Sequence, residues 1–459
     1  MIKVYGRNEG ETHELFELLR ILYPLYETDD QDIILEIKDN HFSIRCGDIN
    51  YTYPLSIYKS TNDIKRLLLE DISLPNKEET IWGTLIGIRP TKLVYELLKS
   101  KSPQEVDSIL KNEYRIKKFG RELLLDIVDV EEEKVGNISP DSYSVYLHIP
   151  FCPTKCEYCS YPTIGSKKGD LVREYVKILL DEIFYYKNKF KHTPKTIYIG
   201  GGTPSAIPSD DLHRISEALI QIFGKPLEYT VECGRPDTIS TKLIQGLHEI
   251  GVNRISINPQ SMIQSTLDVL GRSHTIEDIH NAYTISREAG IQEINMDLIL
   301  GLPGESPEIF LHSLDQVIQK KPDNITIHSL SIKNGAKFWE KKKVSPFHYK
   351  EILHTTVLAK DLLKDHGYRP YYMYRQKRTV GNGVNIGYTL TGKASMYNIL
   401  MMEERQTILG LGMSSTTKFL YPNENRIEKI YQYKNLKDYK EHWMKRQEKK
   451  DIILQDFDF

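Results

Sequence analysis

The stretch YSVYLHIPFCPTKCEYC, residues 143–159, combines a strand pattern with three closely spaced cysteines, and it is the most informative part of the chain. Within it, Ser144–His148 is a run of β-branched and aromatic residues, which is typical of a buried strand. The loop that follows carries Cys152, Cys156 and Cys159 at the spacing C-x3-C-x2-C. A loop with potential ligands directly after a strand is typical of α/β sheets, because ligands gather at the carboxyl ends of their strands.

Further strand and helix patterns alternate through the middle of the chain. We expect strands at Thr196–Ile199, Glu228–Glu232, Arg254–Asn258, Ile294–Leu300 and Asn324–Leu330, and helices at Leu171–Lys187, Asp210–Phe223, Thr241–Ile250, Ile276–Ala289 and Pro307–Lys320. Strands joined by crossovers long enough for a helix imply a parallel sheet. Two architectures fit this pattern, an open doubly wound sheet and a barrel that can be incomplete.

The flanks of this region have different patterns. The first flank predicts a small α+β domain with a linker near Gly136–Asp141, and its elements are a strand at Lys3–Tyr5, a helix at Glu11–Leu22 and a hairpin of Ile33–Ile37 and Phe42–Cys46. The last flank combines a helix at Tyr349–His366, a Gly/Asn-rich loop at Gly381–Gly392 and a charged, solvated surface helix at Leu436–Lys449. We therefore expect three domains, 1–138, 139–340 and 341–459.

Composition excludes several classes of protein. The 459 residues include 61 Lys and Arg against 63 Asp and Glu, so there is no overall basic field for nucleic acid or an acidic membrane surface. No apolar run approaches the length of a transmembrane helix, and the polar amino terminus does not resemble a signal peptide. The expected location is cytoplasmic. Five cysteines, an odd and sparse number, make a disulfide framework a poor interpretation.

The cluster of three cysteines instead indicates a metal site. Structural zinc takes four protein ligands, and iron–sulfur clusters usually take four thiolates. Three close cysteines without an obvious fourth favour a [4Fe-4S] cluster with one open iron, which can chelate the amino and carboxylate groups of S-adenosylmethionine. One electron from the cluster then cleaves the sulfonium and releases a 5′-deoxyadenosyl radical. The alternative is a zinc knuckle completed by His148 or Cys233.

A glycine run, IGGGTPS at residues 199–205, follows the second strand. Glycines let a ligand lie against bare backbone, whose polar groups can hold an ammonium or a carboxylate. The run lacks the lysine of a phosphate-binding loop and the spacing of a dinucleotide-binding loop. One βα unit after the cysteine loop, it is suited to the methionyl end of the same cofactor.

Together these features resemble the radical S-adenosylmethionine superfamily, and more closely the oxygen-independent coproporphyrinogen III dehydrogenase group. The shared motifs, in order, are HIPFC-x3-C, GGGTP, TVECGRPD, ISINPQS, LGRSHT and NMDLILGLPGE. IWGTLIGIRPTKL, YYMYRQK and YNILMMEERQTILGLG are similar to the HemZ-type branch of that group. The resemblance implies a partial (β/α)6 radical SAM barrel, with an N-terminal α+β domain and a C-terminal mixed α/β domain.

The resemblance also implies roles for individual residues. Cluster ligation falls to Cys152, Cys156 and Cys159. Contacts with the cluster-bound S-adenosylmethionine fall to Tyr146, Tyr158, Gly201, Gly202, Thr203 and Glu232, the last accepting from a ribose hydroxyl. A second S-adenosylmethionine, as in members with two cofactors, would contact Gln260, Arg272 and Asp297, with lesser contacts from Ser331 and Thr416.

The implied substrate, coproporphyrinogen III, carries propionates around an apolar macrocycle. Its site should be roomy and aromatic, with Arg or Lys at its edge. The segment Tyr368–Arg378 interleaves tyrosines with cations and offers Arg375, Lys377 and Arg378, although a solvated edge strand would have the same pattern. Arg89 is a second candidate, where helix capping alone would also explain the motif.

The implied reaction is oxidative decarboxylation of two propionates to vinyls, which gives protoporphyrinogen IX in anaerobic haem biosynthesis. An electron donor such as flavodoxin or ferredoxin is the expected partner. Dehydrogenases of this group carry a further cysteine two residues after the third ligand, where this chain has Tyr161. The haem-chaperone branch also lacks that cysteine. A haem-binding chaperone and a radical enzyme that acts on haem are therefore the alternatives.

Overall fold

The computed structural model describes residues 1–24, 32–75, 77–78, 80–87, 89–139, 141–331, 333, 335–340, 349–376, 379–424 and 426–459. The described chain forms two compact units, Met1–Val128 and Asp129–Phe459. The division into three domains at residues 138/139 and 340/341 stays a prediction. No helix in the described ranges is long and apolar enough to cross a membrane.

The first unit contains a four-stranded sheet in the order β1-β2-β3-β4, namely β1 (Ile2–Tyr5), β2 (Ile33–Ile37), β3 (His41–Cys46) and β4 (Ile49–Pro54). Its helices are α1 (Glu9–Leu22), α2 (Thr61–Glu70), α3 (Thr91–Leu98) and α4 (Pro103–Asn112), and α5 (Lys118–Val135) continues into the second unit. The predicted first strand, first helix and hairpin are confirmed. Leu15, Leu18, Phe42 and Ile44 form its core, and Cys46 is buried among them.

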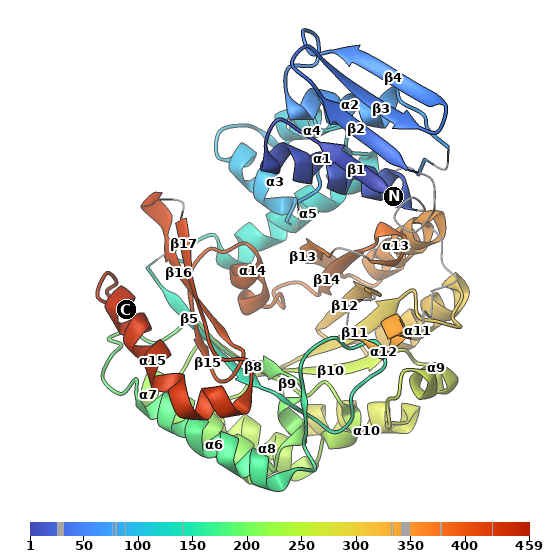
Figure 1. Cartoon of the computed structure of the whole chain (residues 1–459). Helices are drawn as coiled ribbons and strands as arrows, with labels where there is room; N and C mark the ends of the chain where they lie inside the picture. Colours follow the sequence, from blue (N-terminus) through green and yellow to red (C-terminus); the bar gives the residue numbers. More distant parts are fainter. Residues whose placement is uncertain are drawn as a thin grey trace. The chain divides into compact units, whose positions relative to one another are not determined.

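The second unit is built on one large sheet, whose centre consists of the six predicted strands (Figure 1). They pair in parallel and in chain order as β5 (Tyr143–Ile149), β8 (Thr196–Gly201), β9 (Glu228–Glu232), β10 (Arg254–Gln260), β11 (Glu293–Leu300) and β12 (Asn324–Ser329). The helices between them are α6 (Gly169–Phe184), α7 (Ser209–Phe223), α8 (Thr241–Ile250), α9 (Gln264–Val269), α10 (Ile276–Glu288) and α11 (Pro307–Gln319). The predicted βα units are confirmed.

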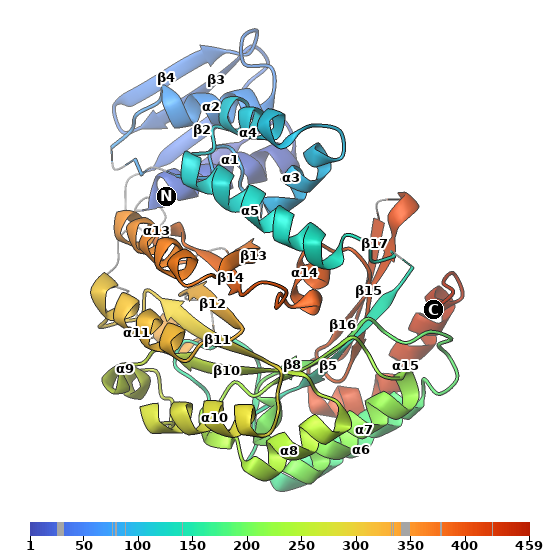
Figure 2. The same cartoon turned by 180° about the vertical axis from the view of Figure 1, so that it is seen from behind.

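The carboxyl-terminal strands extend this sheet at both ends. On one side β15 (Thr407–Leu411) pairs in parallel with β5, and β16 (Thr416–Tyr421) and β17 (Arg426–Tyr431) follow. On the other side β14 (Val384–Thr389) and β13 (Arg369–Arg375) add antiparallel strands. The sheet runs from β13 to β17 without closing. In Figures 1 and 2 the crossover helices lie on the outer face of the curved sheet, so an incomplete barrel is confirmed over a doubly wound sheet.

Smaller elements complete the second unit. The cysteine loop is flanked by β6 (Phe151–Cys152) and β7 (Ile164–Gly165), which pair with each other. The helix α14 (Met396–Met402) contacts β8 and β13 from the inner side of the sheet (Figure 2). The remaining helices are α12 (Lys337–Glu340), α13 (Tyr349–Asp365) and α15 (Leu436–Leu454).

The predicted loop at Gly381–Gly392 is wrong, because it contains strand β14. Gly387, at the centre of this segment, lies in the strand and not in a turn, and the side chain of Tyr372 packs closely against its Cα atom. A Cβ atom on Gly387 would lie 1.9 Å from Cε1 of Tyr372 on the neighbouring strand. Glycine inside a strand often marks such an approach.

The interpretation of the last helix as a solvated surface helix is wrong for one of its faces. Lys450 of α15 is 1% exposed and donates from Nζ to the carbonyl oxygen of Gly410, 2.7 Å away. Its neighbour Glu182 of α6, with no exposed surface, accepts from Gln447 Nε2 at 2.6 Å and from Gly412 N–H at 2.9 Å. Burial lowers the pKa of Lys450 to about 8, a shift that Glu182 opposes. A buried polar network therefore joins α15 to α6 and β15.

We expect Glu182→Ala to lower the free energy of unfolding by about 3–5 kcal/mol, because it leaves a buried ammonium and several donors unpaired. Urea unfolding at neutral pH measures the difference. Glu174→Ala is the matched control, since Glu174 lies on the same helix and pairs with Lys440 of α15 at the surface. Its cost should stay within about 1 kcal/mol. Equal losses in the two variants would contradict the structural role of the buried network.

Candidate active site

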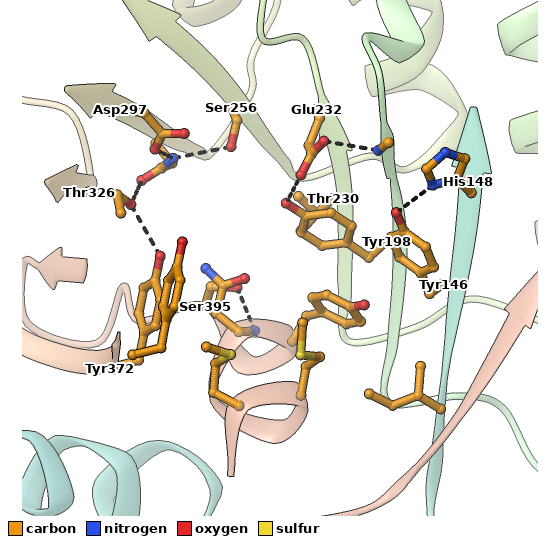
Figure 3. Close-up of a pocket in the computed structure, with 18 of the residues that line it drawn as sticks. Tyr146, His148, Tyr198, Thr230, Glu232, Ser256, Asp297, Thr326, Tyr372 and Ser395 are labelled. Atoms are coloured by element: carbon orange, nitrogen blue, oxygen red, sulfur yellow. Dashed lines mark hydrogen bonds between the residues drawn. The ribbon is translucent and has the colours of Figure 1, made fainter. Parts of the chain in front are cut away.

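A cavity of about 760 Å³ lies on the inner side of the sheet in the second unit (Figure 3). This volume is within the usual range of small-molecule sites. Seven tyrosines line it: Tyr146, Tyr161, Tyr198, Tyr371, Tyr372, Tyr374 and Tyr397. Strand β13 and helix α14, both from the carboxyl-terminal part of the chain, supply four of these tyrosines. The cavity wall therefore combines residues of the predicted barrel with residues that follow it in the sequence.

Three of the tyrosines form a stacked wall. The rings of Tyr198 on β8 and Tyr397 on α14 are 4.3 Å apart between centroids, with an interplanar angle of 23°. The ring of Tyr146 on β5 stacks 6.2 Å from Tyr198 and 6.3 Å from Tyr397. Such a wall offers a flat apolar surface to a planar or macrocyclic ligand. Tyr397 begins the motif YNILMMEERQTILGLG, but sequence reasoning assigned it no role, because its helix approaches β8 only through the tertiary fold.

Glu232 occupies the carboxyl end of β9 and points into the cavity (Figure 3). Its carboxylate accepts from the Tyr198 hydroxyl at 2.6 Å and from the Gly201 N–H at 3.2 Å. Burial raises the pKa of Glu232 to about 7, although the hydrogen bond from Tyr198 opposes the shift. The carboxyl group therefore titrates near neutral pH and can accept from a ligand hydroxyl above it.

Asp297 on β11 also lines the cavity, beside a histidine that sequence reasoning missed. His328 Nε2 lies 3.6 Å from Asp297 Oδ2, and its Nδ1 lies 3.3 Å from Asn385 Oδ1. That oxygen already accepts from the Ser329 N–H, and the amide nitrogen donates to the Tyr374 carbonyl, so the orientation of the Asn385 amide is fixed.

The contacts of His328 bear on its protonation. A proton on Nδ1 would be donated to Asn385, whereas the same nitrogen can also accept from the Tyr374 hydroxyl at 3.2 Å, and the carboxylate of Asp297 faces Nε2 and favours a proton there. Burial alone would lower the pKa of His328, but the contact with Asp297 outweighs it and the pKa is raised. The cavity thus places the His328 imidazole against the Asp297 carboxylate, an arrangement that favours the protonated ring.

The cysteine loop, Cys152–Cys159, lies next to this cavity. Tyr161 and Pro162, directly after the loop, line the cavity wall. The loop is held by the N–H of Glu157, which donates to the Leu270 carbonyl at 3.0 Å, and by the Glu157 carbonyl, which accepts from the Phe338 N–H at 3.0 Å. All three cysteines are free thiols. Burial raises the pKa of Cys152 to about 11, so ligation there requires a metal to displace the proton.

The glycine segment packs directly against the cysteine loop. The N–H groups of Gly202 and Thr203 donate to the carbonyl oxygens of Ile149 and Phe151, at 2.8 and 2.7 Å. A Cβ atom on Gly202 would lie 3.0 Å from the sulfur of Cys152 and 2.6 Å from the Phe151 oxygen. The segment can therefore offer carbonyl oxygens to a ligand, which suits an ammonium group.

Two arginines converge on the sulfur of Cys156. Arg272 Nη1 lies 3.9 Å from it and Arg235 Nη1 lies 4.0 Å from it. Arg272 also donates to the Tyr158 hydroxyl at 3.2 Å, and its Nη2 donates to the carbonyl oxygens of Gly234 and Asn258. The structure thus groups Arg272 and Tyr158 with the cysteine loop, not with Glu232 and Asp297. The predicted contact of Arg272 with a cofactor carboxylate stays a prediction.

Gln260 ends β10 in a strained conformation. Its φ angle is +71°, where a side chain is disfavoured, and the strand register shifts before it. Its side chain is buried, and Oε1 has no hydrogen-bond partner among the described residues. A strained residue with an unpaired buried oxygen is typical of a ligand site.

The other predicted site residues are placed as follows. Thr416 lines the cavity, whereas Ser331 forms a backbone bridge with Thr379 and does not line it. Arg375 is buried on β13 and is also not part of the cavity wall. Arg89 lies in the first unit, just before α3. Lys377 and Arg378 lie outside the described residues.

Neither residue that the zinc-knuckle alternative names as a fourth ligand is grouped with the three cysteines in the part of the chain that the structure describes. His148 shares a hydrogen bond of 3.0 Å with the Tyr146 hydroxyl, and Cys233 is fully buried at the end of β9. Within the described residues, no three His, Cys, Asp or Glu side chains are arranged to hold a single metal ion. Each iron of a cubane cluster takes one protein sulfur, so its ligands need not converge on one point.

Comparisons with known proteins decide the family. Residues 146–317 match the radical SAM superfamily. The protein "Oxygen-independent coproporphyrinogen-III oxidase-like protein HemZ" of Bacillus subtilis (strain 168) is 39% identical over 376 residues, which are 79% of this chain and 74% of that protein. The chain belongs to the HemZ-like family of radical SAM proteins. The predicted resemblance is thereby confirmed.

Other relatives place this HemZ-like protein in a wider group. The heme chaperone HemW of Bacillus subtilis (strain 168) is 32% identical over 203 residues, which are 43% of this chain and 52% of that protein. Among solved structures, the coproporphyrinogen III oxidase HemN from Escherichia coli, a radical SAM enzyme, matches with a TM-score of 0.54 and 21% identity. The match covers 66% of this chain and 69% of that chain, and it shows a shared fold.

Membership of the radical SAM superfamily implies a [4Fe-4S] cluster and S-adenosylmethionine. The residues present fit these groups on four observations. Three free thiols share one loop, two buried guanidiniums face one of the sulfurs, and the glycine segment approaches the sulfur of Cys152 more closely than a residue with a Cβ atom could. The buried, unpaired Oε1 of Gln260 is a fourth.

Proposed function

We propose that this HemZ-like protein is a radical SAM enzyme that acts on a tetrapyrrole, by oxidative decarboxylation of two propionates of coproporphyrinogen III to vinyls. The observation that carries the proposal is the family match, joined with a tyrosine-lined cavity of about 760 Å³ beside the cysteine loop. The cavity is large enough for part of a macrocycle and one cofactor, and its stacked tyrosines suit a flat apolar ring.

In this proposal Cys152, Cys156 and Cys159 hold the cluster, and its open iron holds S-adenosylmethionine. When bound, these groups supply one-electron cleavage of the sulfonium and abstraction of a hydrogen atom from the substrate. An external donor such as flavodoxin or ferredoxin supplies that electron. The substrate radical then loses carbon dioxide and passes its remaining electron to an external electron acceptor, which leaves the vinyl group. The protein's own contribution is to place the cofactor and the substrate side chain together and to keep water away.

The cofactor side of the site is proposed to lie along β5, β8 and β9. Carbonyl oxygens of the segment Gly201–Thr203 would accept from the methionyl ammonium. Glu232 would accept from a ribose hydroxyl, held in place by Tyr198. Tyr146 would pack against the cofactor from β5, and Tyr158 would contribute from the cysteine loop.

The opposite side of the cavity is proposed to hold the substrate or a second S-adenosylmethionine. Asp297 and Gln260, with Arg272, are the proposed contacts for that second cofactor, and Thr416 and Ser331 the lesser ones. The tyrosines of β13 would line the macrocycle, and Arg375, Lys377 or Arg378 would bind its propionates. His328, beside Asp297, is an additional side chain on this side, and it is cationic when protonated.

An anaerobic product assay tests the proposed reaction. Iron-loaded protein is incubated with dithionite, S-adenosylmethionine and coproporphyrinogen III, and the porphyrins and 5′-deoxyadenosine are separated chromatographically. We expect mono- and divinyl products, with one 5′-deoxyadenosine for each propionate lost. Formation of 5′-deoxyadenosine without any vinyl product would refute this substrate and leave the radical chemistry intact.

A haem-binding chaperone is the second candidate, and a radical enzyme acting on haem is the third. They are supported by HemW relatives and by Tyr161, which lines the cavity where dehydrogenases of the group have a cysteine. Haem titration followed by gel filtration separates them from the dehydrogenase. A stable stoichiometric haem complex favours the chaperone, and loss of the haem spectrum during turnover favours the haem-degrading enzyme.

The binding of S-adenosylmethionine is expected to strengthen as pH rises through 7. The proposed acceptor Glu232 has a pKa near 7, so its carboxylate form grows above that pH, and the carboxylate is the better acceptor for a ribose hydroxyl. Equilibrium binding to the iron-loaded protein between pH 6 and pH 8.5 measures the effect. Glu232→Gln should bind more weakly with a flat pH profile. The same slope in that variant would assign the titration to another group.

A further inference from the structure

The two guanidiniums that face Cys156 are buried to a degree unusual for arginine. Arg235 is 2% exposed and Arg272 is 5% exposed. Their Nη1 atoms approach the same sulfur at 4.0 and 3.9 Å. Both guanidiniums also have other partners, but each directs one Nη1 at this sulfur, so a thiolate or a cluster bound there would lie against two buried cations.

Arg235 is clamped in this position. Asp237 accepts from its Nε at 3.0 Å and from its Nη2 at 3.1 Å, a two-pronged contact, and the Thr154 hydroxyl accepts from its Nη1 at 3.0 Å. The Thr238 hydroxyl donates to the Arg235 carbonyl at 2.7 Å. Arg235 therefore joins the loop after β9 to the cysteine loop, and its guanidinium is fixed toward Cys156.

A fixed cation near a cluster ligand alters the energy of cluster reduction. A cubane cluster with three thiolates carries a net negative charge and becomes more negative when it is reduced. A positive charge in a region of low dielectric stabilises the reduced form more than the oxidised form. Hydrogen bonds and charges around the sulfurs are among the factors that set the potential of iron–sulfur clusters.

We propose that Arg235, held by Asp237, is a positioning residue that raises the reduction potential of the cluster at Cys156 and so eases its reduction by the electron donor. The inference rests on the proposed role of the three cysteines, but not on the identity of the substrate. Arg272 has a separate task in the loop, because it is also bound to Tyr158 and to two carbonyl oxygens.

The test is a redox titration of the full-length, iron-loaded protein, followed by electron paramagnetic resonance, without S-adenosylmethionine or tetrapyrrole. Arg235→Gln should lower the equilibrium constant for reduction at least about tenfold, which is about 59 mV for one electron. Arg235→Lys keeps the charge and should recover much of the loss. Arg287→Gln is the matched control, since Arg287 of α10 pairs with Asp323 at 2.7 Å and should leave the potential unchanged.

A second variant tests the sign of the effect. Asp237→Asn removes the counter-charge of Arg235, and it should raise the potential. A wild-type potential in Arg235→Gln with full iron content overturns the inference. If Arg235→Gln does not retain iron, Asp237→Asn decides, and an unchanged or lowered potential overturns it. If the wild-type protein itself takes up no cluster, the result refutes the proposed role of the three cysteines as cluster ligands and not the role of Arg235.

Discussion

Cys156→Ala is expected to abolish reductive cleavage of S-adenosylmethionine, with 5′-deoxyadenosine formation falling by more than about 1000-fold. The reason is that two thiolates cannot retain a cubane whose fourth iron is left to the cofactor. Of the three cysteines, Cys156 is the most deeply buried, and both guanidiniums approach its sulfur. Anaerobic reconstitution followed by iron and sulfide analysis and a timed assay of 5′-deoxyadenosine measures both parts of the effect.

Cys46→Ala is the control for this experiment. Cys46 is a buried thiol on β3 of the first unit, away from the cysteine loop in sequence, so its loss removes a sulfur without touching the proposed ligands. Its variant should keep the full iron content and rate. Retention of cofactor cleavage in Cys156→Ala, or equal losses in both variants, would contradict the assignment of the cluster.

Gly202→Ala is expected to reduce cofactor cleavage by about 100-fold, because small displacements of reacting groups have effects of this size. The added Cβ atom would lie 2.6 Å from the Phe151 oxygen and 3.0 Å from the Cys152 sulfur, so the glycine segment or the cysteine loop must shift. Binding of S-adenosylmethionine and the rate of its cleavage, both on iron-loaded protein, measure the change.

Gly165→Ala separates this effect from the general cost of replacing a glycine. Gly165 lies on β7, which pairs with the strand that carries Cys152, but a Cβ atom there would meet nothing within 4 Å. Its variant should cleave the cofactor at the wild-type rate. Full activity in Gly202→Ala with an intact cluster would show that this segment does not place the cofactor.

The central part of the fold could be predicted because its signals are local. Strand β9 and helix α8 were predicted with the residues that the structure has, and strands β5, β8 and β10 within a few residues. The pairing of β15 with β5 could not be predicted, because it joins segments more than 250 residues apart and no local pattern encodes it. The same holds for α15, whose buried Lys450 has a partner on a distant helix.

Several candidate residues that the motifs singled out lie at or near the cavity, although their roles stay predictions. Glu232 and Asp297 both line the cavity, and the glycine segment packs on the cysteine loop as the order of βα units implied. His328 and Tyr397 were not assigned to the site from the sequence, although Tyr397 begins one of the quoted motifs. A histidine in a strand and a tyrosine in a short helix have many ordinary roles, and only the tertiary fold brings them to Asp297 and Tyr198.

The contacts of Arg235 and Arg272 are a further example of an arrangement that only the tertiary fold creates. The spacing of GRPD and LGRSHT gave no indication that both guanidiniums would face one sulfur. Their convergence depends on the turn after β9 and on the loop after α9, whose conformations are set by contacts with the cysteine loop. The positions of charged groups around the cysteines are therefore the feature of this site that is hardest to predict from the sequence.

The most direct test of the account is the electron paramagnetic resonance spectrum of the dithionite-reduced, iron-loaded protein before and after S-adenosylmethionine is added. The account predicts a signal from a reduced [4Fe-4S] cluster whose g-values change on addition, because the cofactor ligates the iron that the three cysteines leave open. A cluster signal that is identical with and without S-adenosylmethionine would contradict the account.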